Sequence, residues 1–310
     1  MSHDPINIAA AADDRYAPHL GVTIKSIVIN NPLETFNFYI IDAGITPENK
    51  QKLNSLFMGN SLIHWHWLSC DDSSLNHVKV DKYISKVTYY RILLPLLIPD
   101  SVEKILYFDC DMLILGEIRV LWQEDISDYV IAAVQNPDHI GHISKLGIKS
   151  PDDYFNAGMM LINTKRWRKE DITSKVLNFI ASNPTFIIFW DQDALNAVLY
   201  HRWKKVSHRW NELSYMFNKN GYSRPNIEMI NFFLNDVVVI HFAGPVKPWN
   251  YACQDSLRFL YFDVLSLTPW DQMGFNDINF KNRLLKWAFD YLPRPIIVLL
   301  MKIYHFFIGK

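Results

Sequence analysis

Residues 6–14 read INIAAAADD, an apolar run that stops at two acidic residues. Such a bounded run predicts a buried strand over 6–12, with Asp13 and Asp14 at its carboxyl end. The alternation continues to residue 68, with helices expected over 19–30 and 47–57 and strands over 36–41 and 62–68. This order predicts an α/β fold in which helices cover both faces of a mostly parallel sheet.

The remainder of the chain carries further periodic segments. Helices are expected over 88–97, 167–182 and 191–199, and strands over 104–108, 129–134, 155–163 and 237–240. Residues 136–153 are rich in Pro, Gly, His and Asp, which is typical of a loop and marks a candidate lid. The character of the sequence changes near Pro269. We therefore expect a catalytic domain over 1–268 and a C-terminal extension over 269–310.

The composition narrows the class of protein. Apolar residues make up 49% of the 310 residues and charged residues 20%, which is ordinary for a soluble globular protein. The formal net charge of −1 provides no basic field, so no nucleic-acid partner is expected. Three widely spaced cysteines form no zinc pattern and favour a reducing, cytoplasmic setting. The N-terminus lacks secretory features, and no apolar run is long enough to span a bilayer.

The strongest chemical signal is FDCD at 108–111, where an apolar strand is expected to end. Asp109 and Asp111 stand at positions i and i+2, so their side chains lie on one face. Two carboxylates there can bind one divalent cation, which prefers oxygen ligands. Ligands bind at the carboxyl ends of strands in open α/β sheets, and a pyrophosphate leaving group needs such a cation. A solvated acidic turn is the alternative interpretation.

A second signal follows the last expected strand, where His241 is followed by GPVKPW at 244–249. Neutral imidazole is a good ligand for Mn²⁺, and Lys247 is near enough in sequence to meet a phosphate oxygen. A single histidine after a strand is more often structural. Its combination with the Gly-Pro-x-Lys-Pro-Trp segment favours a role in binding.

Two further signals are ambiguous when each is taken alone. A small residue such as Ala11 lets a flat ring approach the backbone, and Asp13 can accept a hydrogen bond from a uracil or a ribose. The segment WDQD at 190–193 begins an expected helix. Either Asp191 or Gln192 lies beside a reacting sugar carbon, or the acidic residues only cap the helix.

Taken in order, these blocks resemble glycosyltransferase family 8, especially the bacterial galactosyl- and glucosyltransferases of lipopolysaccharide and lipo-oligosaccharide cores. The resemblance runs from about residue 6 to residue 249. The matching blocks are AADD at 11–14, TYYR at 88–91, FDCD at 108–111, FNAGMMLIN at 155–163, DQD at 191–193 and HFAGPVKPW at 241–249. Six ordered blocks are far more specific than any one of them.

The resemblance implies a GT-A-type, Rossmann-like fold and a role for each matching residue. Asp109, Asp111 and His241 would hold Mn²⁺ (or Mg²⁺) on the diphosphate of a UDP-hexose. Ala11 and Asp13 would line the uridine pocket, Arg91 would meet the donor, and Asn156, Ala157 and Gly158 would shape the sugar pocket. Asp191 would contact the donor hexose, Gln192 would lie under the reacting carbon, and Gly244 and Lys247 would close on the diphosphate.

The resemblance also implies transfer with retention of the anomeric configuration. A double displacement needs a nucleophile opposite the leaving group, and Gln192 is a neutral amide. Front-side attack needs only positioning and electrostatic stabilisation, and it is the mechanism we favour. One position departs from the family pattern, because Arg15 follows Asp13-Asp14 where a small polar residue is usual.

The tail over 283–310 alternates basic residues with Leu, Ile, Trp, Phe and Tyr. This pattern is typical of an interfacial anchor, and similar tails occur in relatives that act on lipid acceptors. We expect peripheral attachment to the cytoplasmic face of the inner membrane and a lipid-linked oligosaccharide acceptor. A helix packed on the core is the alternative.

The main hypothesis is therefore a transferase that uses UDP-galactose or UDP-glucose in lipopolysaccharide synthesis. A transferase for an O-antigen, a capsule or a protein-linked glycan fits the same fold. A sugar nucleotidyltransferase needs a glycine-rich basic loop after the first strand, and AAAADDRYAPHL at 9–20 is not one. A non-catalytic sugar-nucleotide-binding protein is the alternative outside enzymes, and it predicts loss of a metal ligand or of the DQD block.

Overall fold

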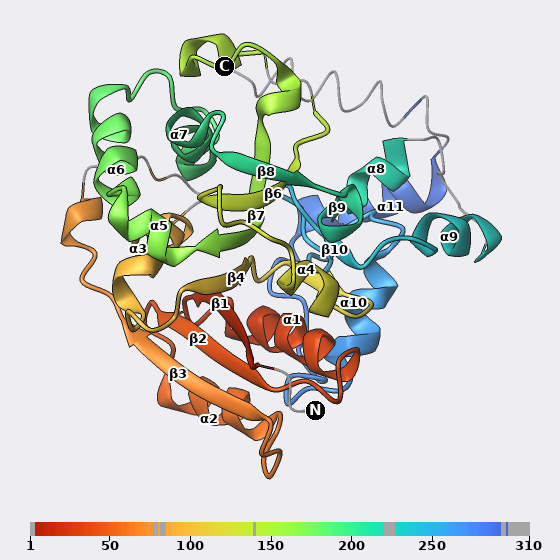
Figure 1. The fold of residues 1–310 in the computed structure, drawn as a ribbon. Coiled ribbons are helices and arrows are strands. Elements are labelled where there is room, and N and C mark those ends of the chain that lie inside the picture. The colour runs from red at the N-terminus through yellow and green to blue at the C-terminus, as the bar shows by residue number, and fades with distance from the viewer. Residues whose placement is uncertain are drawn as a thin grey trace.

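The computed structural model describes residues 4–76, 78, 80, 85–138, 141–219, 227–292 and 296. Its seven-stranded sheet is built from β1 (Ile6–Ala12), β2 (Phe36–Asp42), β3 (Ile63–Ser69), β4 (Lys104–Phe108), β6 (Ile131–Gln135), β7 (Phe155–Asn163) and β8 (Trp203–Val206). A three-stranded sheet contains β5 (Met112–Ile114), β9 (Glu212–Leu213) and β10 (Val239–His241). The smaller sheet lies beside the larger one (Figure 1).

The large sheet has the order β3-β2-β1-β4-β7-β6-β8 and is mostly parallel, as predicted. The pairs β1–β2, β2–β3, β1–β4 and β6–β8 run parallel, whereas β7 runs antiparallel to both β4 and β6. Parallel neighbours need a long crossover, usually a helix. The connection from β6 to β7 is instead the predicted loop, and its described residues contain two short 3₁₀ turns, Ile143–Leu146 and Pro151–Asp153.

Helices cover both faces of the large sheet (Figure 1). One face packs against α1 (Ala17–Ile29), α2 (Pro47–Ser55) and α10 (Arg258–Leu265). The other packs against α3 (Tyr90–Leu97), α5 (Thr164–Lys169), α6 (Ile172–Ser182) and α7 (Trp190–Leu199). The remaining helices are α4 (Arg119–Trp122), α8 (Ser214–Lys219), α9 (Ile227–Leu234) and α11 (Phe280–Tyr291).

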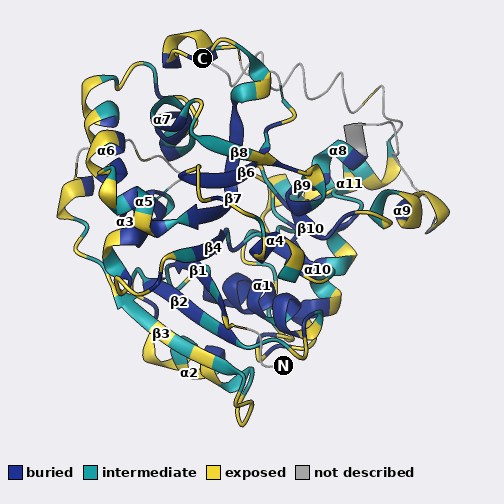
Figure 2. Cartoon of the chain, viewed as in Figure 1, coloured by how far each residue is buried: buried dark blue, intermediate teal, exposed yellow. Residues whose placement is uncertain are grey.

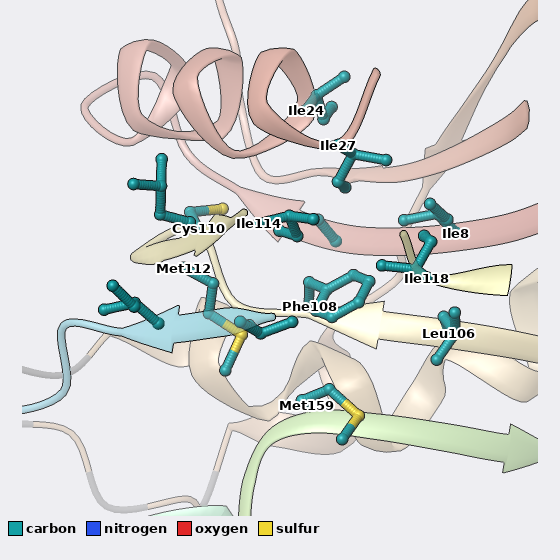
Figure 3. Packing of buried hydrophobic residues seen from close by; sticks show 14 of the residues in the cluster. Ile8, Ile24, Ile27, Leu106, Phe108, Cys110, Met112, Ile114, Ile118 and Met159 are labelled. Carbon is teal, nitrogen blue, oxygen red and sulfur yellow. The ribbon is translucent and has the colours of Figure 1, made fainter. Parts of the chain in front are cut away.

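Strand β1 explains why the sheet needs cover on both sides. Ile8 and Ala10 belong to the core cluster on the α1 face, whereas Ala9 and Ala11 belong to the cluster on the α3 face. Successive residues of a strand point to opposite faces, so an unbroken apolar run is buried on both. Figure 2 shows this central strand region buried between more exposed outer helices. In Figure 3, Ile24 and Ile27 of α1 lie over the apolar side chains of the strands.

Some element boundaries differ from the prediction. The helix expected over 167–182 is two helices, because Asp171 between them adopts a left-handed conformation (φ 50°). The short strands β5, β8 and β9 were not predicted. Runs of two to four residues are too short to display the two-residue period of a strand. The strand expected over 237–240 begins at Val239 and includes His241.

Trp270 connects the start of the expected C-terminal extension to the catalytic core. Its side chain is buried against α1, and its indole N–H donates to Asn49 Oδ1 at 3.2 Å. At Gly21, a Cβ atom would lie 2.5 Å from Cζ3 of the Trp270 ring. Glycine at this point of α1 therefore makes room for the indole. The division of the chain at 268 stays a prediction.

We expect Gly21→Ala to destabilise the protein by about 1–3 kcal/mol, because the new methyl group overlaps the Trp270 ring. Helix propensity alone would give the opposite sign, about 1 kcal/mol in favour of alanine. Urea unfolding followed by circular dichroism measures the difference. In a Trp270→Ala background the same substitution should become neutral or stabilising. An equal cost in both backgrounds would contradict the packing explanation.

Candidate active site

The candidate site lies where several strands end and begin. Asp109 directly follows β4, Asp111 directly precedes β5, and His241 is the last residue of β10. Strand β10 pairs with β5, placing His241 opposite Met112, and the N–H of Phe242 donates to the Asp111 carbonyl at 2.9 Å. Backbone pairing thus brings together residues that are 130 positions apart in the chain.

Asp109, Asp111 and His241 form a candidate metal site. One ligand atom from each of the three lies within 4.8 Å of the others, and His241 Nε2 lies 3.3 Å from Asp111 Oδ1. Arg91 and Tyr107 donate to Oδ1 of Asp109 at 2.8 and 3.2 Å, which leaves its Oδ2 available. Two carboxylate oxygens and one imidazole nitrogen suit Mn²⁺, with Mg²⁺ favouring oxygen more strictly. The donor set therefore fits the predicted metal.

The two aspartates have different electrostatic surroundings. Burial raises the pKa of Asp111, but Lys247 and His241 outweigh burial and hold that pKa well below its ordinary value. Lys247 Nζ forms an ion pair with Asp111 Oδ2 and donates to the Phe242 carbonyl at 3.0 Å. Burial also raises the pKa of Asp109, and there the opposing effect of Arg91 is insufficient. Positive charge is therefore most favourable beside Asp109.

Arg91 lies buried between two carboxylates. Its Nη2 donates to Asp109 at 2.8 Å, and its Nε lies 3.0 Å from Asp191 Oδ2. Nε instead donates to the Thr88 carbonyl at 3.1 Å, so Asp191 Oδ2 is buried without a hydrogen bond. Burial raises the pKa of Asp191 to about 6, against the lowering effect of Arg91. Asp191 thus pairs with Arg91 by charge beside the candidate metal site, while its Oδ2 has no hydrogen bond.

The first residues of β7 form the floor of the site. Arg91 Nη1 donates to the Ala157 carbonyl, and the N–H of Asp109 donates to the Gly158 carbonyl at 2.9 Å. At Gly158, a Cβ atom would lie 2.9 Å from both His241 Nδ1 and Met112 Cε. Glycine is therefore required for the close approach of His241. Asn156 Oδ1 accepts from the N–H of Gly158 at 3.0 Å.

Gln192 lies in the first turn of α7 and reaches the same floor. Its Oε1 accepts from the N–H of Ala157 at 3.0 Å, and its Nε2 donates to the Tyr154 hydroxyl at 3.1 Å. Gln192 and Arg91 thus both contact the backbone of Ala157 in β7, Gln192 at its N–H and Arg91 at its carbonyl. The structure thus brings together the residues from the TYYR, FDCD, FNAG, DQD and HFAG blocks.

The residues predicted to bind uridine lie at the end of β1. Ala11 is buried, and its carbonyl accepts from Cys110 Sγ at 3.3 Å. Asp13 accepts from the N–H of Tyr16 at 3.0 Å and pairs with Arg15 at 3.2 Å, so it also closes the turn before α1. Gly244 has a left-handed φ of 105°. Among the described residues, no hydrogen bond or ion pair joins Asp13 or Gly244 to the metal site.

Asn211 is a part of the site that the sequence did not reveal. Its Oδ1 lies 3.0 Å from His241 Nδ1, and its Nδ2 donates to Asn156 Oδ1 at 2.9 Å. Since Asn156 Oδ1 already accepts from a main-chain N–H, the Asn211 amide can only donate to it. Its oxygen therefore faces Nδ1–H of His241 and leaves Nε2 free for a metal. No motif marks Asn211, which lies between a 3₁₀ turn and the two-residue β9.

Comparison with known proteins agrees with this arrangement. The family model for glycosyl transferase family 8 matches residues 7–253. The chain belongs to glycosyltransferase family 8. It is 36% identical over 288 residues to General stress protein A of Bacillus subtilis (strain 168), covering 90% of this chain and 100% of that protein. It is 27% identical over 277 residues to a lipopolysaccharide 1,2-glucosyltransferase of Escherichia coli, covering 86% and 80% of the two chains.

The fold is likewise that of a solved family member. The crystal structure of the galactosyltransferase LgtC, in complex with donor and acceptor sugar analogs, superposes with a TM-score of 0.75. The two sequences are 26% identical, and the match covers 90% of this chain and 100% of LgtC. The predicted GT-A-type α/β fold is confirmed, and the family 8 chain is a glycosyltransferase.

We expect Asn211→Leu to weaken Mn²⁺ binding about 10- to 100-fold, because His241 loses the acceptor that orients its ring. Mn²⁺ titration by electron paramagnetic resonance measures the affinity directly. Asn31→Leu is the matched control, since Asn31 is equally buried but bonds to Ile27 and Ile118 instead. Unchanged Mn²⁺ affinity in a folded Asn211→Leu protein would remove Asn211 from the metal site.

Proposed function

We propose that this glycosyltransferase moves galactose or glucose from a UDP-sugar to a hydroxyl of a lipopolysaccharide or lipo-oligosaccharide core, with retention and with Mn²⁺. The observation that carries the proposal is that a candidate metal site and a buried carboxylate lie next to each other. Asp109, Asp111 and His241 form a candidate cation site, and this site adjoins the buried carboxylate of Asp191 through Arg91. A sugar diphosphate needs both features, a cation for its diphosphate and a hydrogen-bond acceptor for its sugar.

The chain's own residues divide the work between charge and position. A divalent cation held by Asp109, Asp111 and His241 would neutralise charge on the departing diphosphate. Lys247 already supplies a second positive charge beside Asp111. Asp191 Oδ2, which lacks a hydrogen bond, is suited to accept one from a hexose hydroxyl. Such a site lowers the barrier to transfer by holding the diphosphate and the hexose in place and by stabilising the charge that develops on them.

The residues near the reacting carbon favour front-side attack. Gln192 is a neutral amide with both ends hydrogen-bonded, and an amide is a poor nucleophile. Retention then arises when the acceptor hydroxyl attacks on the face from which the diphosphate departs. In this mechanism Gln192 Oε1 has one lone pair remaining beside Ala157, which suits a developing positive charge.

The names of the relatives support a saccharide acceptor. The Escherichia coli relative is named as a lipopolysaccharide glucosyltransferase, and LgtC was solved with donor and acceptor sugar analogs. These two relatives differ in the hexose they transfer, yet they are 27% and 26% identical to this chain. Both UDP-glucose and UDP-galactose therefore enter the test. An O-antigen, capsule or protein-linked glycan is the alternative acceptor class.

We expect the wild-type protein to release UDP from UDP-galactose or UDP-glucose in the presence of Mn²⁺, and EDTA to stop this release. Many transferases hydrolyse the donor slowly without an acceptor, so the acceptor need not be known. Asp111→Ala should lower the rate at least about 100-fold, since one metal ligand is lost. Asp100→Ala is the control, because that carboxylate is 98% exposed.

Each result leads to a different conclusion. The faster donor identifies the hexose. Metal-dependent UDP binding without UDP release from either donor would favour the non-enzyme alternative, a sugar-nucleotide-binding protein. Neither binding nor release would contradict the UDP-sugar assignment.

We further propose that the protein is cytoplasmic and attaches peripherally to the inner face of the membrane through its C-terminal segment. Helix α11 exposes Phe280, Leu284, Trp287 and Tyr291 and carries Arg283 and Lys286. Aromatic and basic residues on one helix suit the interface of an anionic bilayer. None of the described helices is both long and apolar enough to cross a membrane. Residues 293–295 and 297–310 of the predicted anchor lie outside the described part.

We expect the protein to co-float with vesicles containing phosphatidylglycerol, and Trp287→Ala combined with Tyr291→Ala to reduce the bound fraction severalfold. The reduction follows from the loss of two exposed aromatic side chains at the interface. Leu33→Ala, at a 91% exposed apolar residue in the turn after α1, is the control. Equal flotation of all three proteins would contradict attachment through α11.

A further inference from the structure

A chain of four hydrogen-bonded side chains leads away from the amide of Gln192. Gln192 Nε2 donates to the Tyr154 hydroxyl at 3.1 Å, and that hydroxyl donates to Asp193 Oδ1 at 2.7 Å. Asp193 Oδ2 lies 2.9 Å from His142 Nε2. Tyr154 and Asp193 are fully buried, so water does not compete for these contacts. Neither residue belongs to the metal site or to the predicted sugar pocket.

The direction of these hydrogen bonds is fixed at Asp193. Its Oδ2 accepts from the main-chain N–H groups of Ile188 and Phe189, both at 2.7 Å, and such groups can only donate. Burial, reinforced by the charge of Asp193, raises the pKa of Tyr154 far above its ordinary value, so its hydroxyl keeps its proton. That proton points to Asp193 Oδ1. The Tyr154 oxygen must therefore accept from Gln192.

The same direction is imposed at the other end of Gln192. The N–H of Ala157 can only donate, so it requires the amide oxygen, Oε1, on its side. A side-chain amide has one donor end and one acceptor end. The N–H of Ala157 requires the acceptor end, and the Tyr154 oxygen requires the donor end. The amide is therefore held in one orientation and one plane. Oε1 lies next to Ala157, whose carbonyl accepts from Arg91.

We propose that Tyr154 and Asp193 are positioning residues that hold the Gln192 amide with Oε1 toward the donor sugar. The proposal rests on the function proposed above, because it assigns the orientation of a residue beside the reacting carbon. Positioning groups contribute to rate by holding a reacting constellation in place before the reaction begins. Tyr154 and Asp193 act through Gln192 and touch no substrate themselves.

His142 connects this chain of side chains to the loop between β6 and β7. Its ring lies against Asp193, and the loop residues Ile143, Leu146 and Ile148 pack in one apolar cluster with Tyr154. This is the loop over 136–153 that the sequence marks as a candidate lid. The outer end of the chain of hydrogen bonds is thereby anchored in a packed part of the loop.

Two nearly isosteric substitutions test the proposal in different ways. Tyr154→Phe removes the acceptor for Gln192 Nε2 and leaves the ring in place. Asp193→Asn reverses the chain, because the backbone donors of Ile188 and Phe189 retain the new amide oxygen at the Oδ2 position. The new NH₂ group then donates to the Tyr154 hydroxyl, so the Tyr154 proton turns toward Gln192 Nε2. Two donors, the Tyr154 O–H and the Gln192 N–H, then face each other. Tyr200→Phe is the control, since its hydroxyl accepts from the N–H of Lys149 in the same loop.

For Tyr154→Phe and Asp193→Asn we expect kcat for UDP release to fall about tenfold or more, with the donor KM within about twofold. Tyr200→Phe should retain the wild-type kcat. The double variant should lose no more than the worse single variant, because both changes release the same amide. Wild-type kcat in Tyr154→Phe, or losses that simply add in the double variant, would overturn the proposal.

A second measurement is independent of turnover. The side-chain NH₂ signal of Gln192, assigned in ¹⁵N spectra by its loss in Gln192→Glu, should exchange slowly in the wild type and rapidly in Tyr154→Phe. Equal exchange in the two proteins would overturn the positioning role even if no donor were turned over. A protected signal in a protein that releases no UDP would instead keep the positioning role and contradict the proposed function.

Discussion

Arg91 is buried with its guanidinium in contact with Asp109 on one side and Asp191 on the other. A buried guanidinium requires balancing charge and acceptors, and removal of either carboxylate would leave one side of it without its partner. Arg91 lies at the start of α3, and its partners Asp109, Ala157 and Asp191 lie after β4, in β7 and at the start of α7, so these four elements must meet at one point. Burial lowers the pKa of Arg91, but the two carboxylates outweigh burial and keep it charged. The geometry of the candidate active site depends on the guanidinium of Arg91.

Much of the fold could be predicted because its long elements have clear periods. The unbroken apolar strands β1, β2 and β7 and the helices between them follow from residue pattern alone. The short strands β5 and β9 do not, since a strand of two or three residues has no period to detect. They form through tertiary pairing with β10, which the apolar run at 237–240 predicts. Local sequence carries no record of such pairing.

The candidate site likewise contains residues that the sequence predicts and residues that it does not. Asp109, Asp111 and His241 were found because each stands at the end of an apolar strand, where chemistry is expected. Asn211 and Tyr154 have no such position and occur in no motif. Their importance arises from contact with His241 and Gln192, which are 30 and 38 residues distant in sequence. Side chains that orient other side chains become visible only when the fold is known.

The charges of the site point to the ligand that completes it. Asp109, Asp111 and Asp191 are three carboxylates, and Arg91 and Lys247 are the two permanent cations among them. Ionisation of all three therefore leaves negative charge in a buried region. Burial raises the pKa values of Asp109 and Asp191, and the neighbouring carboxylates add to that rise. A bound divalent cation would reverse the sign and leave the site positive. Such a site at the ends of strands would be complementary to the diphosphate of the proposed sugar-nucleotide donor, so metal and donor would stabilise each other's binding.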